Sequence, residues 1–216
     1  MLSNNTSYSN TNVSVVEGSF RVRVPEGTVN AITRVNKLQQ QVTEVSFSRL
    51  EGFITRFDIE DTKFGKQTKI TIKSDKSYNL SLGYADSLTV NIYKMLRNID
   101  ITKPVQIDLS RKPTEEGKMR TSIFINQDNE PVKWAYTKND PKGLPPMEKI
   151  MVKGKEEWDN SKQLEFLYVN DVKPFQAKIS NNHTVVNYAE GHETVDIPTI
   201  QMPSYDQEIS PDDMPF

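Results

Sequence analysis

Residues 45–84, VSFSRLEGFITRFDIEDTKFGKQTKITIKSDKSYNLSLGY, contain three runs with the composition of β-strands. The first, Val45–Ile59, is rich in β-branched and aromatic residues and is interrupted by Gly52, which indicates a bulge in a long, bent strand. In Gln67–Lys73 and Tyr78–Tyr84, apolar residues alternate with polar ones, as they do in strands with one buried face. Short polar turns separate the three runs. The stretch therefore predicts three consecutive strands.

The spacing of apolar residues changes after Asp86, where Leu88–Ile99 has the period of a helix. Pro104–Leu109 and Met119–Asn126 then alternate again as strands do. A helix between the third and fourth of five short antiparallel strands is typical of the OB-fold, a small Greek-key barrel. We therefore expect a mainly β protein with a five-stranded OB-fold barrel. Another small β-barrel or a sandwich with a helical insert is the alternative.

The remaining residues flank this predicted barrel. Val13–Val16 and Phe20–Val24 favour strands, and the apolar spacing of Asn30–Gln41 indicates a weak helix. Composition predicts four parts. Residues 1–44 are expected to form a partly disordered N-terminal β extension, and residues 45–140 the OB-fold domain. Residues 141–178 are expected to pack on the barrel or at a subunit contact, and residues 179–216 to form a disordered acidic tail.

Charge is distributed unevenly along the chain. Residues 179–216 contain seven acidic residues and neither Lys nor Arg, whereas residues 1–178 hold all 27 basic residues against 22 acidic ones, a net charge of +5. This asymmetry predicts a body that binds a polyanion and a separate tail that binds proteins. Phe216 follows Pro215 and carries a free carboxylate, a combination that fits a small apolar pocket ringed by Lys and Arg.

Several classes of function are disfavoured by what the sequence lacks. There is no cysteine, and the two histidines, His183 and His192, have no neighbouring ligand pattern, so we expect no metal or cofactor. No phosphate-binding glycine loop or nucleophile–base motif occurs, which indicates a binding protein and not an enzyme. No apolar run approaches the roughly 18 residues of a membrane span. We therefore expect a soluble, cytoplasmic protein.

Basic residues gather in the two loops that flank the binding face of an OB-fold, which are the loops after the first and fourth strands. Aromatic residues out of phase with the predicted core add faces on which bases stack. The candidate ligand is single-stranded DNA, and the candidate residues are Phe53, Arg56, Phe57, Lys63, Phe64, Lys66, Lys69, Lys73, Arg111, Lys112, Lys118, Arg120, Phe124, Trp134 and Tyr136. Ordinary solubilising charges, and rings buried under the flanking segments, are the alternative reading.

The last five residues, Asp212-Asp213-Met214-Pro215-Phe216, resemble the C-terminal tip of bacterial-type single-stranded DNA-binding proteins. Met214 stands where that family usually has Ile or Leu. The resemblance implies a protein that coats and protects single-stranded DNA without sequence preference in replication, recombination and repair. It also implies that the tip docks onto polymerase, helicase, primase or recombination proteins, with Phe216 as the anchor.

The chain departs from the bacterial members of this family in two places. About 44 residues precede the predicted barrel, and the bacterial proteins lack a segment like residues 141–178. The chain therefore looks more like a phage-encoded protein that acts in an infected bacterial cell, and these departures leave its oligomeric state open. Two other functions are alternatives. An RNA-binding OB-fold protein fits the basic loops equally well but gives no reason for the Pro-Phe terminus. In a structural OB-domain phage protein that binds no nucleic acid, the basic loops would be incidental.

Overall fold

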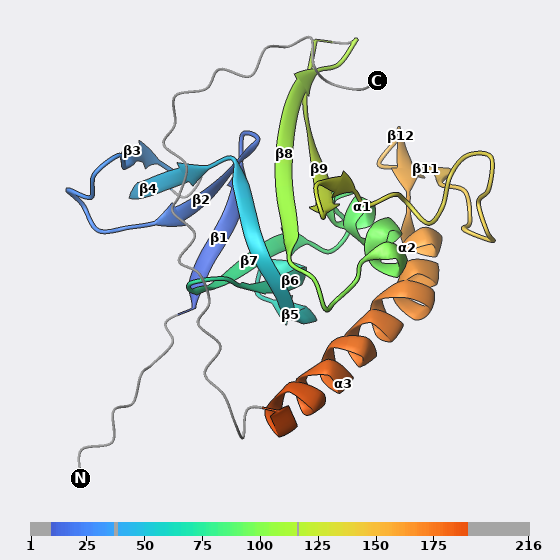
Figure 1. Ribbon diagram of the computed structural model, residues 1–216. Coiled ribbons are helices and arrows are strands. Elements are labelled where there is room, and N and C mark those ends of the chain that lie inside the picture. Colours follow the sequence, from blue (N-terminus) through green and yellow to red (C-terminus); the bar gives the residue numbers. More distant parts are fainter. Residues whose placement is uncertain (1–9, 37–38, 116, 190–216) are drawn as a thin grey trace.

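The computed structural model describes residues 10–36, 39–115 and 117–189 (Figure 1). In this part of the chain, ten strands form one mixed sheet in the order β10-β9-β8-β5-β6-β7-β1-β2-β4-β3, and β11 and β12 form a separate hairpin. The strands of the large sheet are β1 (Thr11–Val16), β2 (Ser19–Arg23), β3 (Ile32–Val35), β4 (Gln41–Phe47), β5 (Arg49–Thr62), β6 (Gly65–Lys73), β7 (Ser77–Gly83), β8 (Val105–Pro113), β9 (Met119–Gln127) and β10 (Glu130–Pro131). The hairpin consists of β11 (Glu148–Val152) and β12 (Lys155–Asp159).

The helices lie on one side of this sheet (Figure 1). They are α1 (Ser87–Met95), α2 (Ser161–Leu167) and α3 (Lys173–Ala189), with a 3₁₀ turn, η1 (Leu96–Asn98), after α1 and a π-helical segment, η2 (Tyr168–Val172), between α2 and α3. The buried apolar core lies where α1 and α3 meet the sheet. Tyr93 of α1 and Phe175 of α3 both pack against Phe57 of β5, with ring centroids 6.0 and 5.6 Å away.

The predicted order of strands and helix is present in β5-β6-β7-α1-β8-β9, but the predicted five-stranded OB barrel is wrong. Closing these five strands into a barrel would require the two outer ones, β7 and β9, to pair with each other. β7 instead pairs in parallel with β1, and β9 pairs with β10. The sheet therefore continues into β1, β2, β4 and β3 and stays open. It curls enough for the β1–β2 turn to reach β8, where Arg111 Nη1 donates to the Glu17 carbonyl at 3.5 Å.

Two further predictions are wrong. Asn30–Gln41 was expected to be helical but contains strand β3, which β4 holds through cross-strand pairs such as Thr33 with Thr43, whose Oγ1 atoms lie 3.1 Å apart. Residues 179–189 were expected to lack fixed structure but continue α3, because Ile179 is buried against the core. The rest of the predicted tail, residues 190–216, lies outside the described residues.

β5 belongs to both halves of the sheet and changes partner at a glycine. Arg49–Gly52 pairs with β8, and Phe53–Thr62 pairs with β6. Gly52 has φ +149°, and a Cβ atom there would collide with the carbonyl oxygen of Lys73. A side chain is therefore excluded by both the backbone conformation and the space available. Gly52 lets one strand bend between two partners.

The bulge that the sequence predicted at Gly52 lies at Thr55 instead. Ile54 pairs with Ile72 and Arg56 pairs with Thr71, so Thr55 is the extra residue on β5. Because side chains alternate between the two faces of a strand, one extra residue exchanges the faces beyond it. Phe53 consequently points outward, whereas Phe57 points into the core.

Candidate nucleic-acid interface

The β5–β6 hairpin holds a phenylalanine ring in solvent. Thr62 Oγ1 accepts a hydrogen bond from the Phe64 N–H at 3.1 Å and donates one to the Gly65 carbonyl at 2.7 Å, which fixes the turn. Phe64 is 72% exposed, and Lys63 Nζ lies 5.0 Å from the centre of its ring. An exposed ring beside an ammonium group offers a base a stacking face and a phosphate a counter-charge.

The outer face of β5, β8 and β9 carries two more exposed rings. Phe53 and Phe124 are 45% and 49% exposed. In the strand register Asp108 lies opposite both Phe124 and Arg49, and Arg49 Nε donates to its carboxylate at 2.7 Å. Lys73 lies opposite Phe53 on β6. The spacing between strands and the rise per residue place the rings of Phe53 and Phe124 roughly 16 Å apart, so each ring would contact a different base.

Phe57 and Tyr136, both predicted to stack on DNA, cannot do so because they are only 2% and 3% exposed. Phe57 lies on the core side of β5 because of the bulge at Thr55. Tyr136 lies among the helical segments, where its ring centroid is 5.8 Å from that of Phe166 in α2 and its hydroxyl donates to Asp171 in η2 at 2.6 Å. Burial and this hydrogen bond raise the pKa of Tyr136 well above its ordinary value. Both residues are part of the core.

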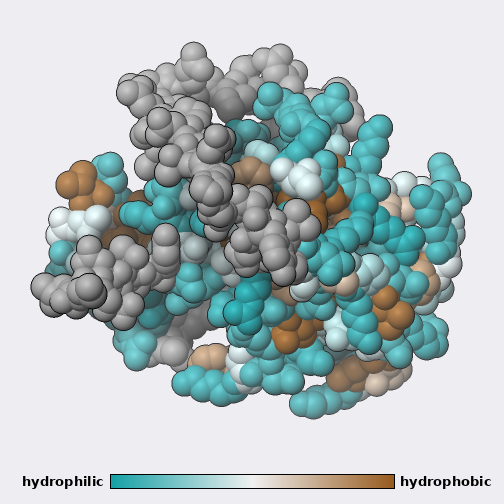
Figure 2. Space-filling model, turned by 60° about the horizontal axis from the view of Figure 1, so that its bottom comes forward, coloured by the Kyte–Doolittle hydropathy of each residue, from teal (hydrophilic) through white to brown (hydrophobic). Residues whose placement is uncertain are grey.

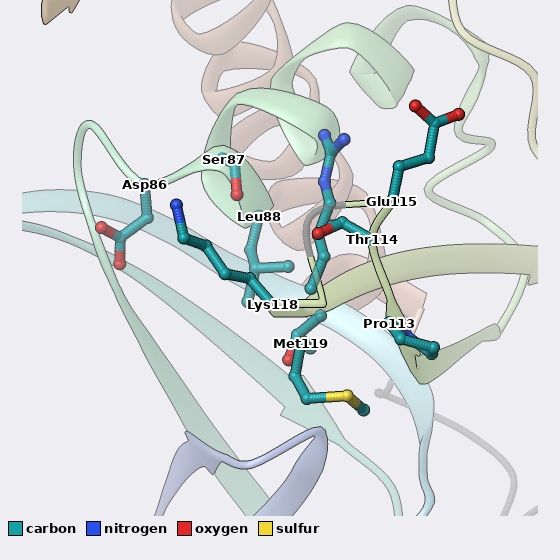
Figure 3. Close-up of a pocket in the computed structure, with 10 residues that line it drawn as sticks. Asp86, Ser87, Leu88, Pro113, Thr114, Glu115, Lys118 and Met119 are labelled. Carbon is teal, nitrogen blue, oxygen red and sulfur yellow. The ribbon is translucent and has the colours of Figure 1, made fainter.

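The β8–β9 hairpin brings four predicted cations together. All four side chains are exposed, and Lys112 lies opposite Arg120 in the register. A cavity of about 850 Å³ separates this hairpin from the start of α1. Figure 3 shows Lys118 extending across it toward the Asp86 side. The four cations are Arg111, Lys112, Lys118 and Arg120.

The two basic hairpins converge on the turn between β7 and α1. On one side, the Tyr84 N–H donates to the Lys66 carbonyl at 3.0 Å, and Lys66 Nζ lies 5.2 Å from the Tyr84 ring centre. On the other side, Asp86 and Leu88 line the cavity that Lys118 also lines. Two loops distant in sequence thus present their cations to neighbouring parts of one surface, which a phosphate backbone can follow.

Arg56 and Lys69 are among the predicted cations that carboxylates already hold within the described residues. Arg56 pairs with Asp58 on its own strand, and Lys69 Nζ lies 3.7 Å from Glu60 Oε1. Each pair has one side chain more than 40% accessible, and ion pairs at the surface contribute little stability, so a phosphate can replace the carboxylate at small cost. Arg56 and Lys69 therefore stay candidates, although weaker ones than Lys63 and Lys66.

Trp134 lies beyond β10 and is 48% exposed. Lys94 Nζ of α1 lies 5.6 Å from the centre of its indole, and the Ala135 N–H donates to the Lys94 carbonyl at 2.7 Å. Partial burial lowers the pKa of Lys94. The sequence did not identify Lys94 as a neighbour of Trp134, because forty residues separate them and only tertiary packing brings them together.

Unlike Trp134, the second exposed tryptophan was not assigned to the interface from the sequence. Trp158 on β12 is 63% exposed, and Lys149 Nζ lies 5.4 Å from its ring centre. It stands on the separate β11–β12 hairpin and not on the large sheet. On the face of the molecule in Figure 2, apolar groups form separate areas in a mostly hydrophilic surface. Separate rings suit individual bases better than one extended protein contact.

The predicted docking tip, Asp212, Asp213, Met214, Pro215 and Phe216, lies outside the described residues. Within residues 10–36, 39–115 and 117–189, no cluster of His, Cys, Asp and Glu could hold a metal ion, and no helix is both long and apolar enough to cross a bilayer. No protein-family model, curated protein or solved structure matches this chain. Any functional conclusion therefore depends on the surface itself.

Proposed function

We propose that this protein binds single-stranded DNA without sequence preference and thereby coats and protects it. The observation that carries the proposal is a set of aromatic rings on or beside the large sheet, each about half exposed or more and most of them next to a cation. The rings are those of Phe53, Phe64, Phe124 and Trp134. Phe64 lies beside Lys63, Trp134 beside Lys94, and Phe53 opposite Lys73. Rings of this kind stack on any base, and cations neutralise the backbone irrespective of sequence.

Single strands fit this surface better than a duplex does. In a duplex the faces of the bases are already stacked on one another, so an isolated ring on a curved sheet has no base face to contact. Exposed rings with flanking cations therefore favour unpaired nucleotides.

Salt dependence tests the electrostatic part of this proposal. If six of the candidate cations contact phosphates, the plot of log Kobs against log salt concentration has a slope of roughly −4 for a single strand. The measurement is the fluorescence anisotropy of a dye-labelled oligo-dT titrated with the full chain at several salt concentrations. A slope near zero would show that these cations do not contact the backbone.

The acidic tail is proposed to recruit replication and recombination proteins through Asp212–Phe216. Removing these five residues takes away two negative charges besides the terminal Phe, so oligo-dT affinity should stay the same or rise. Capture of polymerase, helicase or primase on the immobilised protein–DNA complex should be lost. A truncated chain that binds oligo-dT more weakly would contradict this division between body and tail.

A further inference from the structure

One edge of the large sheet ends in an open strand. β3 is the terminal strand in the sheet order, and within the described residues it pairs with β4 alone. Its apolar side chains are exposed: Ile32 is 57% and Val35 60% accessible. Soluble proteins usually protect such an edge with proline, a bulge or inward-facing charges. β3 contains no proline, and its pairing with β4 runs without a bulge. Its one charged residue, Arg34, is neutralised by Glu44 of β4, whose carboxylate accepts from Arg34 Nε at 2.8 Å and from Nη2 at 3.1 Å.

The backbone of β3 offers hydrogen bonds on its free side. The Asn36 N–H donates to the Gln40 carbonyl at 2.8 Å, and hydrogen-bonded pairs recur at every second residue of an antiparallel ladder. Arg34 therefore exchanges hydrogen bonds with its partner on β4, whereas the N–H and C=O groups of Thr33 and Val35 point away from β4. The Thr43 carbonyl accepts from the N–H of Val24, which follows β2, so it faces β2 and not β3. This is consistent with Thr33, its neighbour on β3, having its N–H and C=O groups on the free side.

The opposite edge of the sheet does not match β3. β10 has only two residues, Glu130 and Pro131, and proline has no N–H to donate. β10 covers only Asn126 and Gln127 of β9, and a contact between this edge and β3 of another copy would repeat without closing. Two β3 strands related by a two-fold axis form a closed pair instead, in which each strand supplies the free groups that the other needs at Thr33.

Side chains select the register of such a pair. Centring it on Arg34 would place two guanidinium groups directly opposite each other, which is unfavourable. Centring it on Thr33 places Arg34 opposite Ile32 of the second copy. A hollow of about 520 Å³ adjoins the end of β3, and its lining residues are Val15, Val16, Glu17, Arg34, Val35 and Asn36.

We infer that two copies of this chain associate through antiparallel pairing of their β3 strands, centred on Thr33. The contact joins two ten-stranded sheets into one continuous sheet. A four-residue strand makes a small interface, so the dimer is weak and forms at high protein concentration. The inference does not depend on DNA binding, and its test uses the protein alone.

Sedimentation equilibrium of the full chain without DNA measures the association. The average mass should rise from 24.7 kDa toward twice that value as the concentration reaches about 200 μM. Val35→Lys should lower the association constant at least about tenfold, since a lysine on an edge strand opposes pairing. Val169→Lys changes another half-exposed valine, in η2, and should leave association unchanged. A monomer at every concentration, or a dimer that Val35→Lys leaves intact, would overturn the inference.

Cross-linking tests the register. The chain has no cysteine, so Thr33→Cys introduces a single thiol. In the Thr33-centred dimer the two thiols lie across the two-fold axis, within the reach of a disulfide. Mild oxidation should link most of the Thr33→Cys chains at high concentration and few of the Val169→Cys chains. Equal yields from the two variants would indicate random collision and would contradict the pairing.

Discussion

Replacing Phe64 and Trp134 together by alanine weakens oligo-dT binding by roughly 2–6 kcal/mol, which corresponds to about 30-fold to 10⁴-fold in Kd. Both rings are exposed and each lies beside a lysine, so the substitution removes two stacking faces without opening the core. The free energy of unfolding should change little, because exposed residues contribute little to it. Anisotropy titrations of the variant and the wild type at one salt concentration measure the loss.

The matched control for this variant is Trp158→Ala. Trp158 is an exposed tryptophan with a lysine 5.4 Å from its ring centre, like Trp134, but it stands on the separate β11–β12 hairpin. Its replacement should leave oligo-dT affinity within about twofold, because surface substitutions away from a binding site have small effects. If Trp158→Ala weakened binding as much as the double variant, the proposed location of the interface would be wrong.

Asp171→Ala should lower the free energy of unfolding by roughly 3 kcal/mol. This is the lower end of the range for removing one partner of a buried ion pair, because the other partner, Arg97, is partly exposed. The Asp171 side chain is fully buried and accepts hydrogen bonds from Arg97 Nε and from the Tyr136 hydroxyl. These contacts join η2 to η1 and to the segment after β10. Removing the carboxylate leaves the Tyr136 hydroxyl buried without its acceptor. Urea unfolding followed by circular dichroism measures the change.

Glu156→Ala provides the comparison for that variant. Glu156 Oε2 accepts from Lys149 Nζ at 2.8 Å, but both side chains are more than half exposed. The loss should be less than about 1 kcal/mol, as for other surface ion pairs. Equal losses from Asp171→Ala and Glu156→Ala would contradict the assignment of Asp171 as the buried link between η2, η1 and the segment after β10.

Local patterns in the sequence predicted the strands and the helix around α1 well, because each pattern depends only on neighbouring residues. β6 alternates as expected, Leu80 and Leu82 of β7 are buried as expected although Asn79 beside them is buried too, and α1 follows Asp86. That the sheet stays open could not be predicted in this way. It depends on β1 pairing in parallel with β7, from Thr11 with Tyr78 to Val13 with Leu80, and no local pattern encodes a contact across 67 residues.

Local patterns also predicted part of the candidate site. Phe53, Phe64 and Phe124 are exposed, as their phase or turn position indicated. The prediction that Phe57 is exposed failed because a one-residue bulge at Thr55 reverses the faces of β5 beyond it. Tyr136 failed because its partner, Asp171, lies on a helical segment that the sequence did not place against it. Exposure along a strand follows from local pattern, but bulges and distant hydrogen bonds decide the exceptions.

The most direct measurement is a comparison of oligo-dT with a duplex of the same length, titrated with the wild-type chain at low salt and followed by anisotropy. Stacking on exposed rings is available only to unpaired bases, so oligo-dT should bind at least about 100-fold more tightly than the duplex. An oligo-U competitor in the same titration reports the preference between DNA and RNA. Failure of oligo-dT to bind at low salt, or equal affinity for the duplex, would contradict single-stranded DNA binding by this surface.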